Sequence, residues 1–394
     1  MGSELSVFPA ARRCMLGLAF LGLATALPAH AENGVTADTI KVGTTNALTG
    51  PIAVCGAVSA GANAYIEKIN KAGGVNGRTI EYTVLDDAYS TQRAIGNVRR
   101  LLGQEKVFAL FSGCGTATGA AVLSAIERDT VPYLFPFVGL DSLTQPTKSN
   151  VFSVLPLYGA QLATIIDYVV RNREIRTAAM SMITIAGHEA WTETVRAKLK
   201  EVGVELIDEQ FVEVTAADKA PYVTQMKSKN PDLVVLVDSS PGAARYLIEM
   251  QRQGWKPKAI TGISTLSDES FLRAAGEVGE GIVIAPAIVL PPTDPRSKEC
   301  VDAMVASNRS IEPSAYTMFG CLGAKVFVDA LERTGKNPTR AGLIAELEKM
   351  QNFESGISGT VSFSADKHQG LESVYPVGIK DGAFLTLGEP LPLQ

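Results

Sequence analysis

Short apolar runs alternate with amphipathic segments of helical length along most of this 394-residue chain, starting at Ile40. Such alternation is typical of βαβ units, in which helices cover a sheet of parallel strands. A first series ends near Asn150, and a second series of the same architecture follows it. We therefore predict an α/β fold with two open parallel-sheet lobes. The strands expected in the two lobes span residues 40–45, 79–85, 107–111 and 133–138, then 178–185, 205–212, 233–237 and 259–263.

The last third of the chain is less regular. Another apolar run, predicted to be a strand, covers residues 281–290, and Pro291, Pro292 and Pro295 then interrupt the pattern. Three helical patterns follow, and after them three short strand patterns. Because this region lacks the long apolar helices of a third domain, we expect it to return to the first two lobes. The expected helices span 297–308, 314–334 and 339–350, and the strands 360–364, 374–379 and 383–387.

The N-terminal segment has the features of a secretory signal peptide. Arg12 and Arg13 precede an apolar run over residues 15–27, and the run ends in Ala29-His30-Ala31, a small-x-small cleavage pattern. The run is too short to span a bilayer, and no later apolar stretch reaches the length of about 18 residues that spanning requires. We expect residues 1–31 to be removed and the mature chain to be exported to the periplasm.

Charge and cysteine content exclude several classes of function. Without residues 1–31 the chain has 34 basic and 40 acidic residues with no basic cluster, which disfavours binding to nucleic acid. Four cysteines remain, an even number that allows two disulfides in three connectivities. No C-x-x-C pair accompanies them, and only His188 and His368 remain as histidines, so we expect no metal site and no cofactor.

Catalytic signatures are also lacking. The chain contains no G-x-S-x-G, no H-E-x-x-H and no phosphate-binding loop with its lysine, so we expect no enzymatic activity. Asp86 and Asp87 are paired carboxylates, but adjacent strand residues point to opposite faces and make a poor catalytic pair.

One stretch, residues 107–121, combines an apolar strand with small residues and the start of a helix near Thr116. Gly113 and Gly115 allow a ligand to approach the main chain, and the first N–H groups of a helix attract polar or anionic groups. The turn therefore predicts a site for something small and polar. An ordinary helix start, capped by a threonine hydroxyl, is the structural alternative.

Four motifs in the expected order resemble those of the type I periplasmic solute-binding proteins of ABC importers, specifically the branched-chain amino acid binding group. The resemblance covers residues 40–387. The motifs are Leu48-Thr49-Gly50-Pro51-Ile52-Ala53-x-x-Gly56, Asn70-x-x-Gly73-Gly74-Val75-Asn76-Gly77-Arg78, Asp86-Asp87 and Ala330-Leu331-Glu332-Arg333-Thr334-Gly335.

The resemblance implies two lobes joined by three crossovers near residues 153–158, 283–290 and 362–370. Lobe 1 is then 32–155 with 286–364, and lobe 2 is 156–285 with 365–394. It further implies a small-molecule ligand held in the cleft between lobes that close about a hinge, and delivery of that ligand to ABC permease subunits in the inner membrane. We expect a monomer. An exported sensor of the same fold, which presents its bound form to a signalling receptor, is the alternative.

The resemblance also implies a set of ligand-binding residues. In lobe 1 they lie on the loop over residues 52–56, on the turn described above and after the strand at 133–138. Trp191 occupies the place of an aromatic side chain that covers the ligand, and packing in the core is the alternative. For Thr116 and Thr118 the alternative is a helix cap or an exposed surface position. The full set is Cys55, Gly113, Cys114, Gly115, Thr116, Thr118, Phe137, Val138, Gly139, Tyr158, Trp191, Ser239, Ser264 and Tyr316.

Two positions depart from the amino-acid-binding pattern. Relatives that bind α-amino acids usually place acidic residues where this chain has Tyr158 and Ser264, and a buried ammonium without a counter-charge is costly. We therefore expect a small organic acid, aromatic or aliphatic, or a neutral amide-like compound, ahead of leucine or valine. Asp238 or Asp268 would restore an ammonium site if either faced the ligand, whereas the alternative for Asp238 is a cap of the helix that begins near Pro241.

Both cysteine pairs are candidates for disulfides. Cys300 and Cys321 reach similar heights if their helices are antiparallel, at about 1.5 Å of rise per residue; two buried free thiols are the alternative. The resemblance places Cys55 and Cys114 on two adjacent ligand loops, which suggests a second bond at the wall of the cleft.

Overall fold

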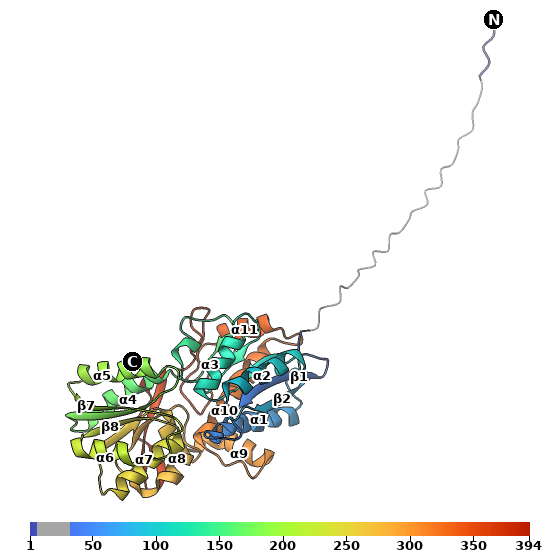
Figure 1. Cartoon of the computed structure of the whole chain (residues 1–394). Coiled ribbons are helices and arrows are strands. Elements are labelled where there is room, and N and C mark those ends of the chain that lie inside the picture. The colour runs from blue at the N-terminus through green and yellow to red at the C-terminus, as the bar shows by residue number, and fades with distance from the viewer. Residues whose placement is uncertain (6–31) are drawn as a thin grey trace. The chain divides into compact units, whose positions relative to one another are not determined.

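The computed structural model describes residues 1–5 and 32–394, of which Glu32–Gln394 form one compact unit (Figure 1). The predicted signal peptide falls almost wholly on residues 6–31, which lie outside the described residues. Of the helices in the described part of the chain, none is long and apolar enough to cross a membrane.

The first sheet has five parallel strands in the order β2-β1-β3-β4-β5. Its central strand β3 is wholly buried and β1 beside it is almost wholly buried, as is typical of a sheet covered on both faces. The strands are β1 (Thr39–Asn46), β2 (Thr79–Asp86), β3 (Ala109–Phe111), β4 (Tyr133–Leu134) and β5 (Val151–Phe152). The helices between them are α1 (Gly56–Lys71), α2 (Thr91–Gly103) and α3 (Thr116–Ala125).

The second sheet has four parallel strands in the order β7-β6-β8-β9. Every residue of its central β8 is buried. The strands are β6 (Thr177–Ile183), β7 (Glu205–Val212), β8 (Leu233–Val237) and β9 (Ala259–Gly262). The helices are α4 (Tyr158–Asn172), α5 (His188–Glu201), α6 (Ala220–Lys229), α7 (Ser240–Arg252) and α8 (Glu269–Ala275). The two parallel sheets confirm the predicted α/β fold with two lobes.

The last third of the chain returns to both lobes. Three helices pack with the first lobe: α9 (Lys298–Ser307), α10 (Ala315–Arg333) and α11 (Arg340–Glu348). Four strands form an antiparallel sheet, joined to the second lobe by a bridge between Ile260 and Val283. These strands are β10 (Ile284–Ala287), β11 (Ser373–Lys380), β12 (Ala383–Thr386) and β13 (Leu391–Pro392). Short 3-10 turns cover Ala53–Cys55, Asp141–Leu143, Ser264–Ser267, Gly276–Gly279 and Pro295–Ser297.

Two predicted strands of the first lobe are shorter than expected. Phe135 has φ 54° and ends β4 after two residues, whereas β3 ends at Phe111 as predicted, before Ser112 with φ 59°, but begins two residues late, at Ala109. The prediction of a strand at 360–364 was wrong: this segment makes only single bridges, one of them between Phe353 and Val361. The lobe boundaries stay a prediction, with the pairing of β10 to β11 indicating that lobe 2 extends through Ala287.

The chain crosses between the lobes three times, as expected, and the first and third crossovers lie side by side. Ser153 donates its N–H to the carbonyl of His368 (2.9 Å) and accepts from the N–H of Gly370 (2.8 Å). The second crossover is tied to lobe 1 where Leu290 donates to the carbonyl of Ile357 (2.8 Å). Main-chain hydrogen bonds therefore hold the strands that link the lobes.

Helices α1 and α10 are in close contact because glycine occupies the contact points. A Cβ on Gly61 would lie 1.9 Å from the carbonyl oxygen of Thr317, and a Cβ on Gly320 would lie 1.9 Å from that of Val58. A disulfide between Cys300 of α9 and Cys321 of α10, with a Cα–Cα distance of 6.1 Å, fixes the neighbouring helix pair. This pairing confirms the prediction made from helix geometry.

Replacing Gly61 by alanine should destabilise the first lobe, because the new methyl group meets main-chain atoms that cannot move aside. We expect the free energy of unfolding to fall by about 1–3 kcal/mol or more, measured by urea denaturation of the mature chain. Gly96→Ala in α2 is the matched control: its Cβ meets nothing within 4 Å, and alanine should stabilise the helix by about 0.5–1 kcal/mol. Equal effects of the two substitutions would contradict this account of the helix contact.

Candidate functional site

A pocket lies where the carboxyl ends of both parallel sheets meet. Its cavity volume is about 60 Å³, within a wider space of about 500 Å³ that includes open solvent. The first lobe lines it with loop residues that follow β1 to β4 and with the start of α10: Ile52, Val54, Cys55, Tyr89, Cys114, Gly115, Thr116, Phe137 and Tyr316. The second lobe contributes the start of α4 and residues after β6 to β9: Tyr158, Ile183, Ile185, Val214, Asp238, Ser239, Ile263 and Thr265. Ligand sites of open α/β sheets occupy this position.

The start of α3 is the most polar part of the wall that lobe 1 provides. Gly115 is the N-cap residue, with φ 111° and no capping side chain. The N–H groups of Cys114 and Gly115 are already engaged, by the Asn46 Oδ1 (2.6 Å) and the Phe137 carbonyl (3.2 Å). The next polar groups are the Thr116 side chain, which interacts with the phenol of Tyr158, and the main chain of Ala117, which interacts with the phenol of Tyr89. The positive end of the helix dipole lies behind them.

A disulfide between Cys55 and Cys114 forms part of the pocket wall. The two Cα atoms are 5.4 Å apart, and the bond joins the loop after β1 to the loop after β3. This confirms the predicted pairing. Because the bond links two loops that both line the pocket, it restricts their motion before any ligand binds.

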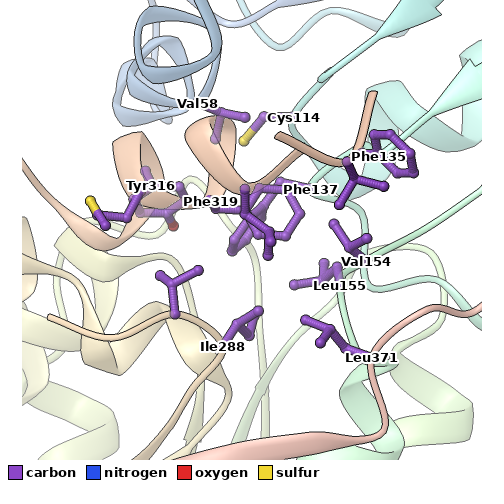
Figure 2. Close-up of a cluster of buried hydrophobic side chains, with 14 of the residues drawn as sticks. Val58, Cys114, Phe135, Phe137, Val154, Leu155, Ile288, Tyr316, Phe319 and Leu371 are labelled. Atoms are coloured by element: carbon purple, nitrogen blue, oxygen red, sulfur yellow. The ribbon is translucent and has the colours of Figure 1, made fainter. Parts of the chain in front are cut away.

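Aromatic side chains close one side of the pocket. The ring of Phe137 lies 4.9 Å from that of Tyr316 and 4.8 Å from that of Phe319, measured between centroids. Figure 2 shows this group beside Leu155, Ile288 and Leu371, which lie on or next to the three crossovers. The segments that join the lobes therefore pack directly against the aromatic wall of the pocket.

Eight of the predicted site residues line the pocket, and six do not. The eight are Cys55, Cys114, Gly115, Thr116, Phe137, Tyr158, Ser239 and Tyr316, and the six are Gly113, Thr118, Val138, Gly139, Trp191 and Ser264.

Trp191 does not cover the pocket but lies behind it. Its side chain is fully buried and its ring meets that of Tyr158 edge-on at 5.2 Å. Gly139 has a related role, since a Cβ there would lie 2.3 Å from the ring of Tyr158. Burial raises the pKa of Tyr158, so its phenol stays a neutral hydrogen-bonding group. Tyr158 thus takes the place in the lining that the sequence had suggested for the tryptophan.

Neither Thr118 nor Ser264 lines the pocket. The Thr118 hydroxyl bonds back to the carbonyl of Gly115 (3.2 Å) within its own helix turn. The Ser264 N–H donates to Gln161 Oε1 (2.9 Å), while its buried hydroxyl has no hydrogen-bond partner among the described residues; the residue lines a small cavity of about 10 Å³ beyond Phe137.

Asp238 lies at the pocket but is already paired. Its Oδ2 accepts from the Nζ of Lys219 at 3.0 Å, and both side chains are almost completely buried. Burial raises the pKa of Asp238, and the Lys219 ammonium opposes that shift. The alternative interpretation of Asp238 as a helix cap was wrong, because Ser239 caps α7 by accepting from the N–H of Gly242 (3.2 Å).

Sequence reasoning predicted the loop over residues 52–56, which includes Val54, but missed Tyr89 and the apolar lining from lobe 2. The missed residues are Tyr89, Ile183, Ile185, Val214 and Ile263. Most of them directly follow a strand, so the strand ends themselves were the signal that was available. Tyr89 was less accessible to such reasoning, because it reaches the pocket through two successive residues with positive φ, Ala88 (48°) and Tyr89 (61°).

A second contact between the lobes lies next to the pocket. Two carboxylates at the start of α8, in lobe 2, accept hydrogen bonds from the first N–H groups of α10, in lobe 1. Glu269 Oε2 accepts from Ala315 at 2.6 Å, and Asp268 Oδ2 accepts from Tyr316 at 3.3 Å. The positive dipole end at the start of a helix favours the charged form of these acids, although burial outweighs it at Glu269. Asp268 is therefore occupied as a partner of α10 and as the N-cap of α8.

This contact should make stability depend on pH. Burial and the neighbouring Asp268 raise the pKa of Glu269 to about 8, against about 4.3 in an unfolded chain. Between these values the folded state binds more protons than the unfolded state, so stability falls as pH rises, by at most about 1.4 kcal/mol per pH unit for this group.

Glu269→Gln should flatten the fall in stability between about pH 5 and pH 8, because a glutamine side chain does not titrate in this range. Thermal melting of the mature chain across this range measures the effect. Glu277→Gln, at an exposed position of the same lobe, is the control and should leave the pH profile unchanged. A profile of Glu269→Gln that matches the parent chain would refute the assignment.

No cluster of three or more His, Cys, Asp or Glu side chains suited to a metal ion occurs among residues 1–5 and 32–394. The site therefore consists of an apolar and aromatic lining, a few hydroxyl groups, a helix start and one carboxylate that is already paired.

Known proteins are similar to this chain in sequence and in fold. A family model described as "Periplasmic binding protein" matches residues 39–383. A "Leu/Ile/Val-binding protein homolog 7" of Brucella abortus (strain 2308) is 27% identical over 333 residues, which cover 79% of each chain.

Two solved structures have the same fold. A branched chain amino acid ABC transporter from Thermus thermophilus with bound valine has TM-score 0.82 and 19% identity, covering 90% of this chain and 96% of that one. A fatty acid ABC transporter substrate-binding protein from Thermomonospora curvata has TM-score 0.84 and 22% identity, covering 92% and 95%. The match over residues 39–383 shows that this chain belongs to the periplasmic binding protein family.

Proposed function

We propose that this protein is an exported solute receptor, which binds a small organic ligand between its lobes and delivers it to the permease of an ABC importer. The observation that carries the proposal is the pocket itself, formed by strand ends of both lobes and walled by a disulfide and by aromatic rings. The names of the related proteins, a Leu/Ile/Val-binding protein homolog and ABC transporter substrate-binding proteins, support it.

The chain acts by binding and not by catalysis. It works in the periplasm as a monomer after removal of residues 1–31, and it needs no cofactor. Its macromolecular partners are the permease subunits in the inner membrane.

The ligand is a small organic acid with an apolar or aromatic body, or a neutral amide-like compound. Its oxygen atoms face Thr116 at the start of α3, where N–H groups and the helix dipole favour negative charge. Its body lies against apolar side chains from both lobes, such as Ile52, Ile185 and Ile263. Branched-chain amino acids are the competing ligand class.

A thermal-shift screen tests the proposal, because a ligand that binds only the folded chain raises its melting temperature. The panel contains benzoate, 3-phenylpropanoate, hexanoate, their amides, and leucine and valine. We expect the largest shifts with the carboxylates. Shifts with leucine and valine alone would assign the competing ligand class, and no shift with any compound would contradict the proposal.

Thr116→Val should weaken binding of the best carboxylate about tenfold, because it removes one hydroxyl from the polar wall at a cost of about 1–1.5 kcal/mol. Titration calorimetry measures the change. Thr118→Val is the matched control, two residues further along the same helix, with a side chain outside the pocket lining. It should change stability but leave the affinity unaltered.

A further inference from the structure

We propose that Lys219 is a built-in counter-ion, which occupies the carboxylate of Asp238 and makes the pocket select ligands that lack an ammonium group. The inference rests on the proposed function and specifies the ligand class further. It identifies a specificity-determining residue that does not itself line the pocket.

Asp238 is the natural place for a ligand ammonium to bind. Among the described residues that line the pocket it is the one acid, and it follows the buried strand β8 at the centre of the second sheet. Its exposed fraction is 3%, so it lies where water screens charge poorly. An unpaired carboxylate in this position would attract a cation strongly.

Both oxygens of that carboxylate are already used within the protein. Oδ1 accepts from the N–H of Ser239 at 2.7 Å, and Oδ2 accepts from Lys219 Nζ at 3.0 Å. The side chain packs against the first turn of α7, where a Cβ on Gly242 would lie only 2.0 Å from Oδ1. Glycine at position 242 is therefore what allows the carboxylate to lie here.

Lys219 is fixed in its position next to Asp238. Its side chain is 1% exposed, and Nζ also lies 4.9 Å from the centroid of the Tyr246 ring, a distance suited to a cation–π contact. The Tyr246 hydroxyl is in turn hydrogen-bonded to Ser181 (2.6 Å). Moving Nζ away would leave two buried charges without partners, which costs several kcal/mol.

A ligand ammonium would consequently meet a neutralised carboxylate and a second cation close by. The attraction to Asp238 is offset by repulsion from Lys219, and the ligand cation loses its hydration on entry. A carboxylate ligand without an ammonium group avoids this loss. The ion pair thus explains why an acid in the lining does not make this pocket a site for zwitterions.

The test compares leucine with 4-methylpentanoate, which has the same body without the ammonium group. Titration calorimetry of the mature chain should show tighter binding of 4-methylpentanoate. Lys219→Met leaves Asp238 without its counter-ion and should shift the affinity ratio towards leucine at least tenfold. Lys219→Arg keeps the positive charge and should leave the ratio nearly unchanged.

A second variant guards against a misfolded Lys219→Met chain. Asp238→Asn leaves Lys219 as an uncompensated cation near the pocket, and should shift the ratio at least tenfold towards 4-methylpentanoate. Thermal melting confirms that each variant is folded. An unchanged ratio in the folded variants would overturn the inference.

The outcomes separate this inference from the proposed function. Wild-type binding of leucine in preference to 4-methylpentanoate would overturn the inference and leave the receptor function in place. If the wild type binds neither probe, the result contradicts the proposed ligand class. The inference then predicts that Lys219→Met binds leucine although the wild type does not.

Discussion

In a parallel sheet the carboxyl ends of all strands lie at one edge. The site of this protein depends on two sheets whose carboxyl edges face the same pocket. The loops after β1 to β4 and after β6 to β9 supply almost the whole lining, although they are spread along the chain from Ile52 to Thr265. The crossovers that connect the sheets contribute Leu155, Ile288 and Leu371 to the buried cluster that contains Phe137 and Tyr316 of the pocket wall (Figure 2). Any change in the angle between the lobes must therefore change the pocket, which couples ligand binding to hinge motion.

The distribution of charge around the pocket follows from burial. Carboxylates occur at three places near it, Asp238, Asp268 and Glu269, and each is engaged by a protein group. Asp238 is paired with a lysine, while Asp268 and Glu269 accept from the start of a helix in the other lobe. A pocket whose acids are satisfied in this way presents hydroxyl groups, apolar surface and a helix start, and these suit an oxygen-rich ligand better than a cation.

Hydrophobic periodicity was sufficient to predict the order of elements and an α/β fold with two lobes. The strand Leu233–Val237, for example, has the predicted bounds. Residues at strand ends were also predictable in outline. The positive φ angle of Phe135 ended β4 four residues early, and no sequence pattern indicated it. Trp191 was misplaced because a helix start does not reveal which face is buried, and the pairing of Asp238 with Lys219 depends on a contact between residues 19 positions apart.

The most direct test of the account is a crystal structure of the mature chain grown with the carboxylate that gives the largest thermal stabilisation. The account predicts the ligand between the lobes, with its carboxylate within hydrogen-bond distance of the start of α3 at Thr116, its body against Ile52 and Ile185, and the Lys219–Asp238 pair intact. A ligand bound outside this pocket, or one whose charged end displaces Lys219 from Asp238, would contradict it.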